Sequence, residues 1–236
     1  MTKSTVQTTG RTYGGMSQEE RIAQRRQQFL RAGIDVFGTE GFRSVTVRRI
    51  CKEAKLTDRY FYECCGSIES LLMDVYEHCM QKTLKGVTAH IASQASTKQW
   101  QQLIDTILDS FFQEMEDPRV ARICMFEADG ASEDMHQLYN RYIGKFAQLT
   151  IQVSKHYVDD WQLSDEEGDV IGNALIGGVI QVTRNWVLSD YQVPRAVLVS
   201  GAGKIFAGMA TLFGLTTNKD LQPASSTDLE GISARL

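Results

Sequence analysis

The sequence predicts an all-α protein in which a small N-terminal helix-turn-helix head precedes a larger helical domain. Apolar residues recur mostly at helical spacing, and the strict alternation typical of strands is hard to find. Proline, which breaks helices, occurs three times in 236 residues, and two of the three lie after residue 190. Between residues 46 and 65, two short helical patterns flank a turn, which is the layout of a helix-turn-helix.

The first helix is predicted to begin at Ser17. The S-Q-E-E stretch places Glu20 three residues after Ser17, which is the spacing of a capping box. Gly38 and Gly41 are suited to end this helix. Residues 1–15 are rich in Thr, Gly, Ser and Gln, so we expect them to form a flexible arm.

Two short helices are predicted next. Thr46 can cap the first of them, and Thr57 can cap the second, which is expected to run through Cys65. Residues 55–57 form the turn between these helices. The inner faces are apolar, as a fixed angle between the two helices requires.

The remaining helices are longer. Ser67 is expected to cap a fourth helix, and later helices are predicted at about 98–116, 118–128, 132–157, 164–188 and 194–213. The predicted boundaries are a flexible arm at 1–15, a helix-turn-helix domain at 16–66, a larger helical domain at 67–215 and a flexible tail at 216–236.

Charge is distributed unevenly along the chain. Residues 1–66 hold 12 Lys and Arg against 7 Asp and Glu, whereas the remainder holds 13 against 22. A basic N-terminal segment on an acidic body predicts an anionic partner for the head, with chance clustering as the alternative.

No catalytic or metal-binding pattern is found. The five cysteines include no C-x-x-C pair, and the four histidines are scattered, so we expect no metal, no cofactor and no enzyme activity. The adjacent Cys64 and Cys65 raise the idea of a thiol switch, but packing is favoured because neighbouring side chains on a helix diverge. No apolar run approaches about 18 residues, and residues 1–15 lack an apolar segment, so no membrane helix and a cytoplasmic location are expected.

The helix-turn-helix carries hydrogen-bond donors on its outer face. Arginines in this position can bind a guanine edge or a phosphate, threonines can present hydroxyls to phosphates, and tyrosines combine an apolar ring with a donor. The alternatives are a solvated helix face for the arginines and packing for the tyrosines. The candidate DNA-binding residues are Thr46, Arg48, Lys55, Thr57, Arg59, Tyr60 and Tyr62.

The stretch Arg25–Leu72 resembles the N-terminal domain of the TetR family of transcriptional regulators. The similarity lies in "AGIDVFGTEGF", "VTVRRICKEA" and "LTDRYFYECCGSIESLL", which follow one another in the family's order. Three residues depart from the family pattern: Lys55 replaces the usual turn Gly, Cys65 replaces a Phe, and Ile68 replaces a Lys that usually contacts phosphate. The first departure predicts a strained turn, and the last predicts weaker DNA affinity.

The resemblance implies a homodimer that leaves its operator when a small molecule binds to the domain at 67–215. Aromatic residues of that domain are candidates to line an apolar pocket, with ordinary core packing as the alternative; they are Phe111, Phe126, Tyr139, Tyr142, Phe146 and Trp186, with Glu127, Asn173 or Arg184 as polar anchors. Small residues at helical spacing are candidates for a two-fold interface, with packing within the chain as the alternative; they are Gly178, Gln181, Gly201, Ile205, Gly208 and Leu212.

We therefore predict a dimeric regulator that binds palindromic operator DNA, most simply a repressor, and that a small hydrophobic or amphipathic effector releases. The rival hypotheses are a helical adaptor for a protein partner or an activator with weakened DNA binding, and an enzyme that uses the helical body.

Overall fold

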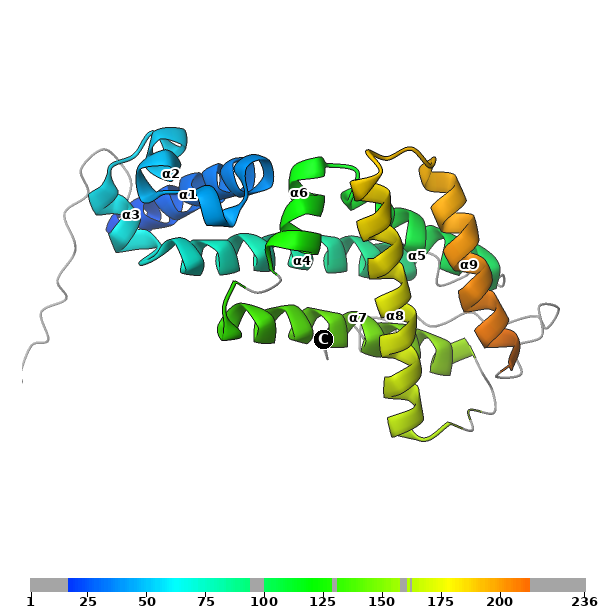
Figure 1. Ribbon diagram of the computed structural model, residues 1–236. Helices are drawn as coiled ribbons and strands as arrows, with labels where there is room; N and C mark the ends of the chain where they lie inside the picture. Colours follow the sequence, from blue (N-terminus) through cyan, green and yellow to red (C-terminus); the bar gives the residue numbers. More distant parts are fainter. Residues whose placement is uncertain (1–16, 94–99, 129–130, 158–160, 162, 213–236) are drawn as a thin grey trace, which may run out of the picture. The chain divides into compact units, whose positions relative to one another are not determined.

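The computed structural model describes residues 17–93, 100–128, 131–157, 161 and 163–212. Within these residues every regular element is a helix (Figure 1), which confirms the all-α prediction. Contacts divide the chain into two compact units, one ending at Val75 and the other beginning at Tyr76. The division falls inside helix α4 (Ile68–Ser93), eight residues into that helix. The predicted arm at 1–15 and tail at 216–236 lie outside the described residues.

The N-terminal unit contains α1 (Gln18–Glu40), the short helix η1 (Phe42–Ser44), α2 (Val47–Ala54), α3 (Asp58–Cys64) and the start of α4. The predicted capping box of α1 is confirmed. The Glu20 N–H donates to Ser17 Oγ at 3.1 Å, and the Ser17 N–H donates to Glu20 Oε2 at 2.6 Å. Together these bonds satisfy two N–H groups that have no partner within the helix.

The core of this unit is built from aromatic and branched side chains. Phe29 and Phe61 are fully buried, and their rings meet edge to face at 5.5 Å. A full burial of this kind contributes about 1.5–3 kcal/mol per side chain. Gly33 permits a close approach of α1 and α4, because a Cβ there would lie 2.7 Å from Val75 Cγ2. This core fixes α2 and α3 with their outer faces exposed.

The turn between α2 and α3 is strained, as the departure at Lys55 predicts. Lys55 has φ 55° and ψ 39°, which is the left-handed region. A side chain with a Cβ pays about 1–2 kcal/mol for this conformation, whereas glycine adopts it freely. The turn is held by the Leu56 N–H, which donates to the Cys51 carbonyl at 3.1 Å.

Lys55→Gly is expected to stabilise the protein by up to about 1 kcal/mol, because relief of the left-handed strain exceeds the entropy that glycine adds to the unfolded chain. Lys52→Gly is the matched control, since Lys52 is also exposed but lies inside α2. There glycine is expected to cost about 1 kcal/mol. Denaturant unfolding of both variants tests the prediction, and equal destabilisation by the two would contradict it.

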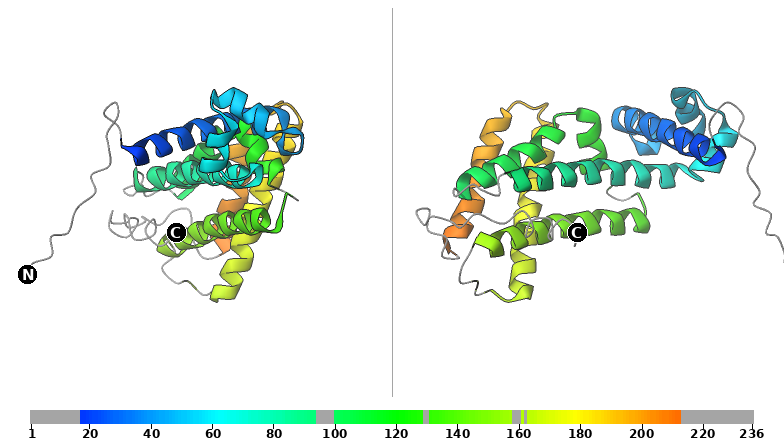
Figure 2. Two further views of the ribbon diagram at one scale, coloured as in Figure 1. Left: turned by 90° about the vertical axis from the view of Figure 1, so that its left-hand side faces the viewer. Right: turned by 180° about the vertical axis from the view of Figure 1, so that it is seen from behind.

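The C-terminal unit contains the rest of α4, α5 (Trp100–Glu114), α6 (Pro118–Arg122), the π-helical turn η2 (Ile123–Glu127), α7 (Glu133–Tyr157), α8 (Asp165–Leu188) and α9 (Arg195–Leu212). Helix α8 packs on α7 and crosses it steeply, and α9 packs on α5 (Figures 1 and 2). The described helices include none that is long and apolar enough to cross a membrane.

The predicted helix over 118–128 is confirmed in its extent, but its second half is π-helical rather than α-helical. α6 ends at Arg122 and continues as a π-helical turn, in which residues five apart share a face. The ion pair from Arg122 Nε to Glu127 Oε1, at 2.8 Å, has this five-residue spacing. The predicted start is confirmed, because Asp117 caps α6 by accepting the Arg119 N–H at 3.0 Å.

A glycine allows α7 and α8 to cross closely, and a capping box begins α8. A Cβ on Gly172 would lie 3.0 Å from the Ala147 carbonyl oxygen and 3.1 Å from Ile151 Cγ1, so a larger residue would push the helices apart. The predicted capping box at the start of α8 is confirmed, with the Glu167 N–H donating to Ser164 Oγ at 3.2 Å.

Candidate nucleic-acid interface and apolar cavity

The outer faces of α2, the turn and α3 carry the residues predicted to bind DNA. Six of them are exposed and Tyr60 is half-buried; the exposed ones are Thr46, Arg48, Lys55, Thr57, Arg59 and Tyr62. The opposite sides of these helices are buried through Ile50 and Phe61, both fully inaccessible. The amphipathic pattern therefore orients one polar face of each helix toward solvent.

The two threonines differ in their local roles. The Thr46 hydroxyl caps α2 by accepting the Arg49 N–H at 3.3 Å, as predicted. Thr57 occupies the N-cap position of α3, but its side chain makes no capping hydrogen bond. The prediction that the Thr57 hydroxyl caps α3 is therefore wrong, and this exposed hydroxyl is not engaged in capping.

The arginines of this surface differ in how many carboxylates they pair with. Arg48 is exposed and has no ion-pair partner among the described residues. The Arg59 side chain is 83% exposed, and its Nε donates to Glu63 Oε1 at 2.8 Å. Exposed pairs of this kind are weak and exchange readily for other partners. By contrast, Arg49 is held by two carboxylates, those of Glu40 at 2.7 Å and Glu53 at 2.8 Å.

The two candidate tyrosines also differ. The Arg25 guanidinium lies 3.8 Å from the centroid of the Tyr60 ring, so Tyr60 is anchored by a cation–π contact with α1. Tyr62 is 61% exposed, with its ring edge against Phe61 at 5.5 Å. Sequence reasoning missed Arg25 as a member of this surface, because nothing in the linear pattern connects it to a residue on α3.

The adjacent cysteines are packed rather than reactive. Burial raises the pKa of the Cys65 thiol to about 12 and raises the pKa of the half-buried Cys64 thiol as well. Neither thiol is ionised at neutral pH, and the thiolate is the reactive form. This favours the packing interpretation over a thiol switch.

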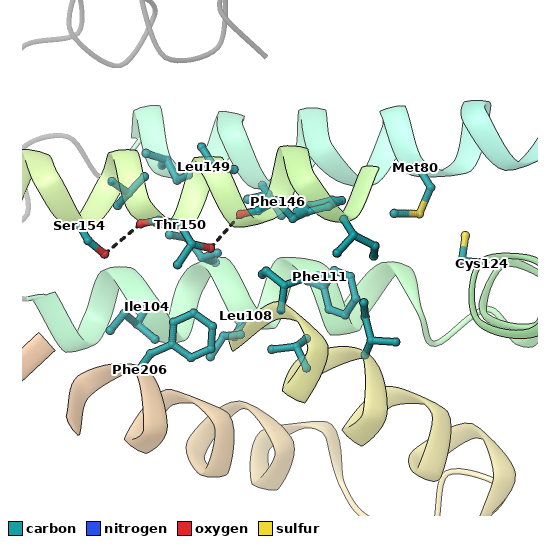
Figure 3. A pocket seen from close by; sticks show the side chains of 18 of the residues that line it. Met80, Ile104, Leu108, Phe111, Cys124, Phe146, Leu149, Thr150, Ser154 and Phe206 are labelled. Carbon is teal, nitrogen blue, oxygen red and sulfur yellow. Dashed lines mark hydrogen bonds between the residues drawn. The ribbon is translucent and has the colours of Figure 1, made fainter. Parts of the chain in front are cut away.

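The C-terminal unit contains an apolar cavity that is partly open to solvent, and its empty space is about 890 Å³ when the open part is counted. Side chains from α4, α5, η2, α7, α8 and α9 line it, and most are aliphatic, aromatic or Met. Figure 3 shows Met80 and Cys124 toward one end, and Thr150 and Ser154 toward the other. Cavities lined mainly by hydrophobic and aromatic side chains are typical small-molecule sites.

Three of the predicted pocket residues line this cavity: Phe111, Tyr139 and Phe146. Sequence reasoning missed most of the wall, because helical spacing marks an inward face without showing which inward faces border a void. The missed lining residues include Tyr76, Met80, Ile104, Leu108, Leu149 and Phe206.

The other three predicted pocket residues lie elsewhere in the unit. Trp186 is fixed by a hydrogen bond from its Nε1 to the Val193 carbonyl at 2.7 Å and by edge contact with Phe112. Tyr142 is buried, and its hydroxyl donates to Glu77 Oε1 at 3.4 Å. Phe126 also lies outside the cavity wall.

The predicted polar anchors are outside the cavity wall as well. Glu127 pairs with Arg122, and the exposed Asn173 donates to the carbonyl of Asp169 at 2.7 Å. The Arg184 guanidinium lies 5.9 Å from the centroid of the Phe126 ring. Each of these three polar side chains therefore contacts another group of the same helical unit rather than the cavity.

Most of the predicted interface residues are exposed on α8 and α9. Gly178, Gly201 and Gly208 are exposed, and a Cβ on any of them would meet nothing within 4 Å. Ile205 is 62% exposed, and Gln181 is also exposed. The side chain of the remaining candidate, Leu212, lies outside the described residues. Packing within the described chain therefore does not explain these small residues.

Comparison with known proteins gives a consistent fold. No protein-family model and no curated protein matches the sequence. Among solved structures, the fatty acid degradation regulator FadR from Bacillus halodurans matches with a TM-score of 0.66 and 18% identity, over 78% of this chain and 95% of that chain. FadR from Bacillus subtilis in complex with stearoyl-CoA matches with a TM-score of 0.64 and 14% identity, over 76% and 96%. A TetR-like regulator from Rhodococcus sp. RHA1 matches with a TM-score of 0.59 and 17% identity, over 80% and 94%. This chain therefore has the fold of TetR-family transcriptional regulators.

Proposed function

We propose that this chain, built on the TetR-family fold, is a homodimeric transcriptional regulator that binds operator DNA through α2 and α3 and is released by a small apolar effector. Two features of the chain carry the proposal: an exposed face rich in hydrogen-bond donors on a helix-turn-helix, and an apolar cavity in the second unit. The similarity to FadR in complex with stearoyl-CoA supports an effector role for that cavity.

DNA binding is supported by the chemistry of the outer faces. In a helix-turn-helix the second helix enters the major groove, which makes α3 the reading helix. Arg59 and Tyr62 lie on the exposed side of α3, and Arg48 lies on the exposed side of α2. An arginine fork can contact two acceptors of guanine, while residues of α2 and the turn, including Lys55, bind phosphates.

Homodimerisation is supported by the exposed face of α8 and α9. Small residues allow two helices to approach closely, and two such helices from each protomer form a four-helix interface. Two reading helices related by a two-fold axis would contact half-sites about 34–36 Å apart on a palindromic operator.

Repression is the simplest output, because a dimer seated on a promoter blocks access to it until the effector binds. We propose that the protein acts in the cytoplasm, where it meets DNA, and that its role is binding rather than catalysis. The described wall of the cavity presents mainly apolar side chains, which suit ligand binding.

Selection of bound DNA from a random pool by the purified full-length protein is expected to enrich a palindrome. Binding to that palindrome should be steeply salt-dependent, with affinity falling by about 10³-fold or more between 50 and 200 mM salt if six or more phosphates are neutralised. A selection that enriches no sequence would contradict sequence-specific DNA binding and favour the adaptor hypothesis.

The weaker DNA affinity predicted from Ile68 is tested by Ile68→Lys. This substitution should tighten operator binding without changing the selected sequence.

A further inference from the structure

The described part of the cavity wall carries no charged side chain. Its thiol is also neutral, because a hydrogen bond with Cys79 and complete burial raise the pKa of Cys124. An ionised ligand group buried there would lose its hydration without gaining a counter-charge, which is strongly unfavourable. The wall therefore selects for an uncharged ligand.

One polar group of the wall is left unsatisfied. Tyr76 on α4 lines the cavity, is fully inaccessible to solvent, and its hydroxyl has no hydrogen-bond partner among the described residues. Burial also raises the pKa of Tyr76, so the hydroxyl keeps its hydrogen. A buried donor without a partner is costly, and a ligand acceptor that bound this hydroxyl would remove that cost. Because a water-sized probe does not reach the hydroxyl, such a ligand must also displace the side chains that cover it.

The hydroxyls at the other end of the cavity are already used as donors. Thr150 donates to the Phe146 carbonyl and Ser154 to the Thr150 carbonyl, each at 2.9 Å (Figure 3). Tyr76 and Met80 both line the cavity and lie one helical turn apart on α4. Figure 3 shows Met80 near Cys124, away from Thr150 and Ser154. The wall therefore has one unpaired donor, on the part of α4 that carries Met80, and mostly apolar side chains beyond it.

We propose that the cavity binds an uncharged apolar ligand that carries one acceptor oxygen, such as that of a ketone, ester or ether, and that this oxygen accepts a hydrogen bond from the Tyr76 hydroxyl. The apolar body of the ligand extends from there along α5 and α7 toward Thr150. This inference deepens the effector role proposed above, because it states the chemical class of the effector, and its test needs no DNA.

Three ligands with one carbon skeleton test the proposal: hexanophenone, hexylbenzene and 6-phenylhexanoate. They carry a neutral acceptor, no acceptor and a negative charge, respectively. Displacement of the neutral fluorophore N-phenyl-1-naphthylamine from the full-length protein measures their affinities. Hexanophenone is expected to bind tightest, and 6-phenylhexanoate at least about tenfold more weakly because of the uncompensated charge.

Tyr76→Phe removes the hydroxyl and keeps the ring. It is expected to weaken hexanophenone binding by about fivefold, the value of one net hydrogen bond, and to leave hexylbenzene within about twofold. Tyr142→Phe is the matched control, since Tyr142 is a buried tyrosine outside the cavity wall. It should change neither affinity.

Three results would overturn the proposal. The first is binding of 6-phenylhexanoate as tight as that of hexanophenone, the second is an equal loss of hexanophenone and hexylbenzene affinity in Tyr76→Phe, and the third is binding of none of the three ligands. The ligand affinities do not depend on the outcome of the DNA selection. The proposal of operator binding and the proposal of the ligand class can therefore be refuted independently. A protein that selects an operator but binds none of the three ligands would refute the ligand class alone.

Discussion

Arg59→Ala is expected to weaken binding to the selected operator by about tenfold for each half-site, and hence by about 100-fold for a dimer that contacts both. It should also relax base preference at the position in each half-site that Arg59 contacts. Binding titrations with the palindrome and with single-base variants of it measure both effects.

The expectation follows from how Arg59 is held. Its side chain is 83% exposed on the reading helix, and its described partner is the neighbouring carboxylate of Glu63, at 2.8 Å. Pairing within the helix keeps the guanidinium extended, and a weak exposed pair gives way to the acceptors of a base edge. Glu63→Gln should therefore leave the base preference unchanged while raising affinity modestly.

Two further variants separate base reading from charge. Arg59→Lys keeps the positive charge but loses the guanidinium, which can make two parallel hydrogen bonds to one base. Compared with Arg59→Ala, it should therefore recover more of the overall affinity than of the base preference. Arg141→Ala removes an exposed arginine of α7, which is not part of the helix-turn-helix, and should leave affinity within about twofold. If Arg59→Ala and Arg141→Ala had equal effects, Arg59 would contribute charge only, and α3 would not be the reading helix.

Local signals in the sequence were sufficient for the helices of this fold. Capping depends on residues three apart, so Ser17, Thr46 and Ser164 could be identified as helix starts without knowing the rest of the chain. The strained turn was predicted instead from the resemblance to the TetR family, in which a Gly usually stands at the position of Lys55, and Lys55 has a left-handed conformation. The π-helical turn at Ile123–Glu127 was not, since its five-residue spacing leaves no distinct apolar pattern over so short a segment.

The cavity was less predictable than the helices, for a physical reason. Phe146 and Trp186 are both buried aromatic residues at helical spacing, yet Phe146 lines the cavity and Trp186 fills core beside Phe112. Which of two buried faces borders a void depends on how four or more helices pack, and no single segment encodes that. The same holds for Tyr76, whose importance rests on the absence of a described partner rather than on its spacing.

Ile205→Asp is expected to convert a dimer into a monomer and to weaken operator binding by about 100-fold or more, because one protomer can then occupy only a single half-site. Ile205 is 62% exposed in the described chain, and Gly178 and Gly201 leave open space where a second copy can approach. A carboxylate buried at such an interface would be unpaired in both protomers.

Sedimentation velocity of the variant measures the change in mass, and Ile22→Asp is the matched control. Ile22 is 43% exposed on α1, so the same substitution there should leave the dimer intact. Both residues are exposed in the described chain, and unfolding midpoints should therefore stay close to that of the parent protein. A monomeric Ile205→Asp that kept full operator affinity would refute the link between dimerisation and half-site binding. A dimeric one would show that the protomers associate through a different surface, and the open glycines of α8 and α9 would then need another explanation.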